Sequence, residues 1–187
     1  MNSARLRGFV GAMTALADQV SPGLPLMEAA RPLLADLVAQ DDWLPAFASV
    51  SDGAQYRQYL LHCDSAERFS LVSFVWGPGQ QTPIHDHQVW GLIGMLRGSE
   101  ISRSYRQVAD GGLVRTGPSV CLEPGQIEAV GPGIGDIHKV SNAHADRVSI
   151  SIHLYGSNIG TVRRHSYQAN GSRMEFVSGY SAATASV

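Results

Sequence analysis

Between about residue 55 and about residue 170 the chain consists of short segments rich in β-branched and aromatic residues. Glycine, proline, aspartate or asparagine separates each segment from the next, as turns between strands require. The segments are residues 55–62, 68–76, 87–96, 100–108, 119–124, 137–142 and 147–155. Many short strands at this spacing predict an antiparallel β-barrel or jelly roll, so we expect an all-β fold over this region.

Residues 1–45 have a helical pattern instead. Apolar side chains recur three and four positions apart at Leu6, Phe9, Val10, Met13, Leu16, Ala17 and Val20. A secretory signal peptide, which two arginines before a short apolar run would suggest, does not need this spacing, so we prefer an amphipathic helix. Residues 25–40 predict a second helix with a kink or a new start at Pro32. We expect both helices to brace or cover the barrel within one domain, 1–187, whose small, polar C-terminal tail is loosely held.

Composition points to a small-molecule partner. The 187 residues carry a formal net charge of -2 and include no basic run longer than Arg163 and Arg164, which argues against nucleic-acid binding. No apolar stretch reaches the length of a membrane span, so no membrane partner is expected. The two cysteines, Cys63 and Cys121, lie in mostly apolar surroundings, and we expect reduced, buried thiols in a cytoplasmic protein. The oligomeric state is left open.

The segment HDH places His85 and His87 two positions apart. On a strand, both imidazoles would leave the same face and could bind one metal ion, whereas Asp86 would point away. A surface pair without a metal would give the same spacing. The surrounding glycines favour the metal, because a glycine, five residues and H-x-H, followed later by G-x-x-H-x-x-x-N around His138, resemble the two motifs of the cupin fold.

A cupin normally has a glutamate four residues after the second histidine, and Gly91 occupies that position here. Three neutral imidazoles from His85, His87 and His138 would leave a divalent ion its full charge and open positions for anionic ligands. Imidazole serves zinc and iron equally well, so the histidines alone leave the metal undecided.

In the segment SISIHLY, Ser151, His153 and Tyr155 alternate with aliphatic residues and share one strand face. They could form the solvated face of an edge strand. They could equally form a hydrogen-bonded chain inside a barrel, which fixes the tautomer of the imidazole and aims the phenol.

With the HDH and DIHKVSN segments, this row resembles the thiol dioxygenase family, which includes cysteine dioxygenase and bacterial 3-mercaptopropionate dioxygenase. The resemblance covers about half of the chain. It implies ferrous iron (Fe2+) on three histidines, and addition of both atoms of O2 to a small thiol to give a sulfinic acid. It also implies that the family's Ser-His-Tyr triad falls on Ser151, His153 and Tyr155.

Departures from the animal enzymes narrow the resemblance. Gly91 stands where they place a cysteine that cross-links to the triad tyrosine, so Tyr155 is expected to be a free phenol. Gln58 stands where they place a substrate-binding arginine. The bacterial 3-mercaptopropionate enzymes instead have an arginine nine residues after the triad tyrosine, which is Arg164 here, with Arg163 an unlikely substitute.

We therefore expect a cupin-fold thiol dioxygenase that prefers 3-mercaptopropionate, with L-cysteine possible. Arg164 would anchor the carboxylate and Gln58 would supply an adjustable polar contact. The alternatives are an L-cysteine dioxygenase proper, a non-redox zinc or manganese cupin acting as isomerase or hydrolase, and a cupin that only binds a ligand. Other residues receive no metal role: His62 and His144 at the surface or core edge, His165 at the pocket mouth, and Trp76 and Trp90 as cavity walls.

Overall fold

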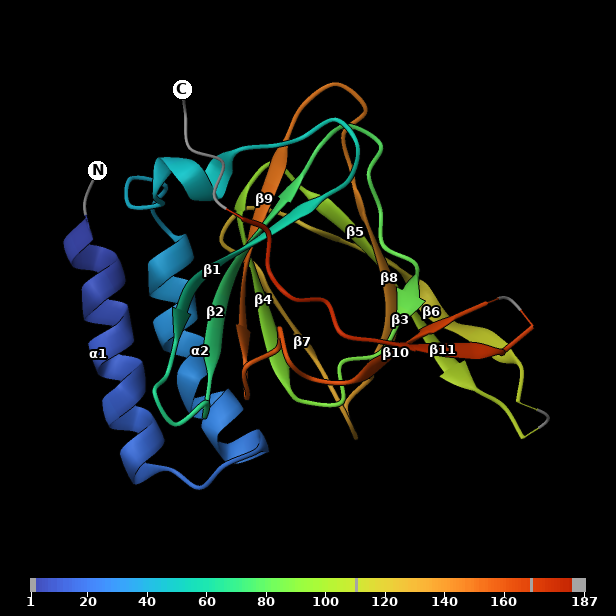
Figure 1. Cartoon of the computed structure of the whole chain (residues 1–187), viewed down its shortest axis with the longest axis horizontal. Helices are drawn as coiled ribbons and strands as arrows, with labels where there is room; N and C mark the ends of the chain where they lie inside the picture. The colour runs from blue at the N-terminus through green and yellow to red at the C-terminus, as the bar shows by residue number, and fades with distance from the viewer. Residues whose placement is uncertain (1–2, 110, 169, 183–187) are drawn as a thin grey trace.

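The computed structural model describes residues 3–109, 111–168 and 170–182. Two helices, α1 (Ser3–Gln19) and α2 (Leu24–Val38), pack side by side against one face of a two-sheet barrel (Figure 1). No helix among the described residues is long and apolar enough to cross a membrane. The predicted combination of an all-β barrel and N-terminal helices is confirmed.

The helices form where the apolar pattern predicts them. Phe9 and Met13 of α1 are buried, and the other apolar residues of its stripe are partly buried against the same core. Helix α2 continues through Pro32 without a new start. Pro32 lies on the exposed side of the helix, where water can satisfy the carbonyl that loses its partner.

All strand pairings within the two sheets are antiparallel. The five-stranded sheet has the order β1 (Arg57–Cys63), β2 (Ser70–Trp76), β9 (Ser149–Tyr155), β4 (Gly91–Arg97) and β7 (Ile127–Val130). The six-stranded sheet has the order β11 (Arg173–Phe176), β10 (Arg164–Tyr167), β3 (Ile84–His85), β8 (Ile137–Asn142), β5 (Glu100–Gln107) and β6 (Leu113–Leu122). A short 3-10 helix, η1 (Ala46–Ser49), precedes β1.

Strand β9 is buried on both faces. Ile152 and Leu154 belong to the core cluster that also contains the buried residues of the helices, whereas Tyr155 packs in a separate cluster inside the barrel. Helix α2 approaches the five-stranded sheet so closely that a Cβ on Gly94 would lie 3.0 Å from Val38 Cγ1. The solvated edge strand considered for this segment is therefore excluded.

Two expectations about peripheral residues are wrong. Cys121 is exposed and Cys63 only half-buried, because β6 and β1 are the outer strands of their sheets. The described part of the tail is also held in place, since Ser181 N donates to Gln58 O at 2.8 Å and Gln58 N donates to Ser181 Oγ at 3.0 Å. The segment after β11 thus crosses back to β1 (Figure 1). Residues 183–187 of the tail lie outside the described residues.

Candidate metal centre

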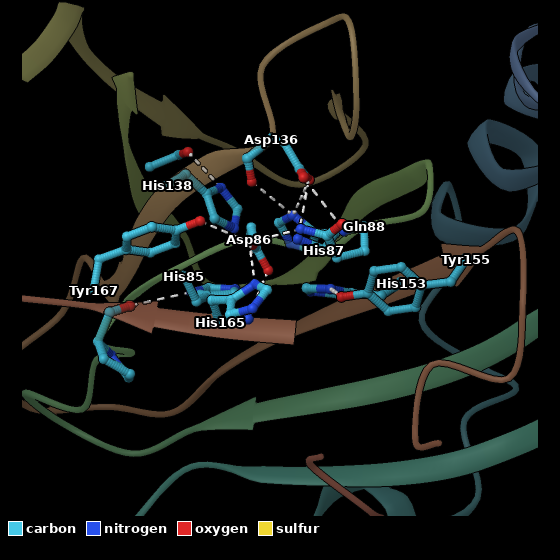
Figure 2. Close-up of polar contacts among 12 residues, drawn as sticks. His85, Asp86, His87, Gln88, Asp136, His138, His153, Tyr155, His165 and Tyr167 are labelled. Atoms are coloured by element: carbon cyan, nitrogen blue, oxygen red, sulfur yellow. Dashed lines mark hydrogen bonds and ion pairs between the residues drawn. The ribbon is translucent and has the colours of Figure 1, made fainter. Parts of the chain in front are cut away.

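Three buried histidines converge inside the barrel. His85 lies on β3 and His138 on β8, and the two are direct partners across the antiparallel ladder. His87 follows β3, where the chain turns at Gln88 with a φ of 61°. The ring centroids are 4.7 to 5.0 Å apart, and one candidate ligand atom from each ring lies within 4.8 Å of the others (Figure 2). His87 therefore reaches the cluster from the irregular segment just beyond β3, two positions after His85 and before the bend at Gln88.

The tautomers of the three rings are set by neighbouring groups. The Nδ1 atoms of His85, His87 and His138 lie, respectively, 3.1 Å from Pro83 O, 3.0 Å from Asp136 O and 3.3 Å from Ser102 Oγ. Carbonyl partners require a proton on Nδ1, and Ser102 donates its own hydroxyl proton to Glu128, which leaves its oxygen to accept. Nε2 of each ring therefore remains available for a metal ion, and such partners orient metal-binding imidazoles in proteins.

Burial also favours the protonation state that metal binding needs. Burial lowers the pKa of His85 to about 3, with a smaller contribution from the neighbouring His87. Burial likewise lowers the pKa of His138 well below its ordinary value. Both rings are neutral near pH 7, so a metal ion need not displace a proton from them. No carboxylate belongs to the described cluster. The donor set is therefore uncharged and fits an ion of intermediate softness such as iron or zinc.

The three histidines line a cavity of about 170 Å³. This is smaller than pockets that hold drug-sized ligands, so it suits a molecule of only a few heavy atoms. Trp76 lines the cavity as expected, whereas Trp90 packs in the core cluster on the helix side. Among the described residues, no aspartate or glutamate lines the cavity.

The row predicted on SISIHLY forms a continuous hydrogen-bonded chain. Trp76 Nε1 donates to Ser151 Oγ at 3.0 Å, Ser151 Oγ lies 2.8 Å from His153 Nε2, and His153 Nδ1 lies 2.8 Å from the Tyr155 hydroxyl. Phe74 stacks on the His153 ring at 4.0 Å. Burial lowers the pKa of His153 and raises the pKa of Tyr155, so that both groups are neutral near pH 7.

Arg164 places a guanidinium in the wall of the same cavity. Arg164 is only 4% exposed. Its Nη2 donates to Ser178 Oγ at 2.6 Å, and the guanidinium lies 4.8 Å from the centre of the Phe176 ring. The Nε atom is buried without a partner, and no acidic group among the described residues forms an ion pair with Arg164. Its neighbour Arg163 is exposed and pairs with Glu175 at 2.8 Å. Arg163 immediately precedes β10 and Arg164 is its first residue, so the two successive side chains point to opposite sides of the extended chain.

The remaining predicted residues occupy varied positions. Gln58 lines the cavity, but its amide Nε2 donates to Gly179 O at 3.0 Å and Ser178 O at 3.3 Å, so it is held by the tail rather than free to adjust. His165 is not among the cavity-lining residues and bonds to Asp86 instead. His62 and His144 are half-buried and outside the histidine cluster.

Sequence reasoning missed two acids near the histidines, the buried Glu100 and the half-buried Glu128. Glu100 on β5 is fully buried, and neither carboxylate oxygen makes a hydrogen bond of ordinary geometry among the described residues, although Ser151 lies close enough to lower its pKa slightly. Burial raises the pKa of Glu100 to about 8, and the pKa of Glu128 on β7 is also raised by burial. Glu128 reaches His138 through Ser102. In the sequence, the alternation of Glu100 and Ser102 with apolar Ile101 is typical of a strand with one solvated face, so it gives no signal of burial.

The family model for cysteine dioxygenase type I matches residues 39–168. Solved structures resemble the chain at low identity. A cupin superfamily protein from Desulfitobacterium hafniense is 13% identical, with 64% of this chain and 94% of that chain covered and a TM-score of 0.47. A protein with a double-stranded β-helix domain from Klebsiella pneumoniae is 15% identical, with 71% and 95% covered and a TM-score of 0.45.

The matched region extends from the end of α2 to β10, and so includes all three histidines, the row on β9 and Arg164. The fold is a cupin barrel, as predicted from the glycine and histidine motifs. The chain belongs to the cysteine dioxygenase type I family.

Proposed function

We propose that the protein is a thiol dioxygenase that oxidises a small thiol carboxylate, preferentially 3-mercaptopropionate, to the sulfinic acid. The reaction R–SH + O2 → R–SO2H adds both oxygen atoms to sulfur and needs no further reductant. L-Cysteine is the second substrate that we consider. The family and the three-histidine cluster support dioxygenase chemistry at a metal.

The buried Arg164 in the wall of the histidine cavity, which forms no ion pair among the described residues, carries the proposal on the substrate. Burying a cation without a counter-ion is costly, so the site favours a ligand that brings a negative charge. A guanidinium binds a carboxylate through two parallel hydrogen bonds, and this geometry would fix the substrate relative to the histidines. The small cavity restricts the substrate to a short chain.

The absence of an acidic group from the described cavity wall favours a thiol carboxylate without an ammonium group. The α-ammonium of cysteine would lose water on entering the cavity and find no carboxylate to compensate. Neutral oxygen acceptors such as the Tyr56 hydroxyl would offset part of this cost. We therefore expect cysteine to be a poorer substrate rather than an excluded one.

His85, His87 and His138 would hold ferrous iron through Nε2. When bound, iron supplies a redox-active centre at which a thiolate and O2 can react. The protein's own contribution there is a neutral, preorganised donor set, because the Nδ1 contacts fix the rings and burial keeps them unprotonated.

Tyr155, His153 and Ser151 would act as a proton-ordering chain. Ser151 Oγ accepts from Trp76, and its hydroxyl proton can be donated to His153 Nε2. In that arrangement Nδ1–H of His153 donates to the Tyr155 oxygen, and the phenolic proton is free to donate into the cavity. The raised pKa of Tyr155 keeps that proton in place. Tyr155 would therefore hydrogen-bond to the substrate or to the incoming oxygen.

The test is oxygen uptake by the iron-loaded protein with 3-mercaptopropionate, cysteine and cysteamine, with mass spectrometry of the product. The Arg164→Ala variant should lose about tenfold to a hundredfold in kcat/KM for 3-mercaptopropionate, which corresponds to one charge-assisted hydrogen-bonding pair. Cysteamine, which has no carboxylate, should be spared. Arg163→Ala is the matched control, because Arg163 is exposed and pairs with Glu175.

Equal losses for cysteamine and 3-mercaptopropionate would contradict the anchor role of Arg164. Oxygen-independent turnover that persists when zinc replaces iron would instead support a non-redox cupin enzyme.

A further inference from the structure

Asp86, the residue between the two histidines of the H-x-H segment, is 1% exposed, and its carboxylate bonds to His165 and Tyr167 rather than joining the metal cluster (Figure 2). Its Oδ1 accepts from His165 N at 2.7 Å. Its Oδ2 accepts from the Tyr167 hydroxyl at 2.8 Å and from Gln88 Nε2 at 2.8 Å, and lies 3.0 Å from His165 Nδ1. The backbone N–H of Asp86 donates to His165 O at 3.0 Å. One buried carboxylate therefore binds β10 at three points.

Strand β10, which carries Arg164, is otherwise weakly attached to the barrel. Its pairing with β3 comprises only Ser166 with His85 and Tyr167 with Ile84, because β3 is two residues long. On its other side β10 pairs with β11, an edge strand in which Met174 is 67% exposed. Hydrogen bonds to a buried carboxylate are stronger than those between neutral groups. Asp86 thus supplies much of the attachment that the short ladder lacks.

We propose that Asp86 is a positioning residue that holds β10, and with it the Arg164 guanidinium, at a fixed distance from the three-histidine cluster. The proposal rests on the carboxylate anchor proposed for Arg164. Arg164 directly precedes His165, whose backbone N–H and C=O both bond to Asp86. The side chains of His85 and His87, on either side of Asp86, belong to the metal cluster. Asp86 therefore links the segment that would bind the metal, His85 to His87, to strand β10, whose Arg164 would bind the substrate carboxylate.

This arrangement makes the separation between metal and guanidinium a property of the Asp86 contacts. A substrate of fixed length must satisfy both groups at once, so a shift of about 1 Å in β10 would weaken the carboxylate contact or misplace the sulfur. A thiol without a carboxylate needs only the metal and would be insensitive to the shift. Loss of the Asp86 contacts should therefore raise the KM for 3-mercaptopropionate and leave cysteamine unaffected.

Two single variants test the inference without altering Asp86 or a histidine. Tyr167→Phe removes the hydroxyl that donates to Asp86 from β10 and keeps the ring. Gln88→Asn is the matched control. The shorter side chain loses the hydrogen bond to Asp86, but that bond lies within the metal-binding loop and does not involve β10. Asparagine also tolerates the positive φ at this position. Tyr167→Phe should raise the KM for 3-mercaptopropionate about twofold to thirtyfold, the range seen for residues that act through a packed network, with kcat nearly unchanged. Gln88→Asn should leave the selectivity between the two thiols unchanged.

Asp86→Ala and Asp86→Asn extend the test, with metal content measured for each. Asp86→Asn keeps an oxygen for the His165 amide and should partly restore what Asp86→Ala loses. In metal-free protein, hydrogen exchange at the His165 amide should accelerate in Asp86→Ala, a readout that needs no activity. In the Arg164→Ala background, Tyr167→Phe should have no further effect on selectivity.

The outcomes separate the two proposals. If Arg164→Ala discriminates between the thiols but Tyr167→Phe and Asp86→Ala impair both equally, the positioning role is wrong and the anchor stands. If Arg164→Ala fails to discriminate between the two thiols, the anchor role of Arg164 is wrong. Unchanged hydrogen exchange of the His165 amide in Asp86→Ala would then show that Asp86 does not hold β10 either.

Discussion

Replacing the buried Glu100 by glutamine should stabilise the protein at neutral pH and above. Neither carboxylate oxygen of Glu100 makes a hydrogen bond of ordinary geometry among the described residues, and burial, opposed only in part by the nearby Ser151, raises its pKa from 4.5 to about 8. The folded protein therefore binds a proton that the unfolded chain releases above about pH 4.5. Stability falls as pH rises through this window, because an increasing free energy is needed to keep the buried carboxyl protonated. Glutamine is similar in shape and never ionises, so it removes this loss.

The size of the effect follows from the two pKa values. Each pH unit between them costs about 1.4 kcal/mol, so the destabilisation reaches about 3 kcal/mol by pH 7 and stops growing above about pH 8. Glu100→Gln should therefore be nearly neutral at about pH 4.5 and about 3 kcal/mol more stable than the wild type at pH 7.

Urea unfolding of metal-free wild type and variant across this pH range measures the difference directly. The difference between the two proteins is the diagnostic quantity, because the buried His85, with its lowered pKa, changes stability in the opposite sense in both. Glu123→Gln is an informative control. Hydrogen bonds from Ser99 and Cys121 lower the pKa of Glu123, so replacing this carboxylate should destabilise the folded protein at pH values above that pKa. A constant difference between Glu100→Gln and wild type at all pH values would refute the reasoning.

Two further predictions concern the metal cluster and its surroundings. His138→Ala should abolish iron retention, because two imidazoles cannot replace a set of three. Metal analysis of the purified variant measures this, and a normal iron content would exclude His138 as a ligand. Gly91→Ala should destabilise the protein by about 1–3 kcal/mol in urea unfolding, because its Cβ would lie 2.9 Å from two ring carbons of Tyr155, and unchanged stability would show that the ring can move freely.

The spacing of polar and apolar residues along the chain was enough to predict several features of the structure. A two-residue period on residues 149–155 places Ser151, His153 and Tyr155 on one face in any strand, and helical spacing identifies the packed side of α1. The H-x-H spacing likewise puts His85 and His87 on one side of the chain. These features depend only on neighbours along the chain, so the sequence is enough to predict them. His138 was instead identified through the resemblance to the second cupin motif, and the pairing of β3 with β8 brings it to the other two histidines.

Other features depend on segments that are distant in the sequence. The period on β9 says which side chains share a face, but the burial of both faces requires helix α2 on one side and the barrel interior on the other. Adjacent Arg163 and Arg164 are equivalent in composition, and only the docking of β10 against β3 turns one to solvent and the other to the cavity. Glu100 and Asp86 resemble surface acids in the sequence and are buried only because other strands cover them. Alternation along a strand specifies which residues face together, whereas burial and its electrostatic consequences are decided by what packs against each face.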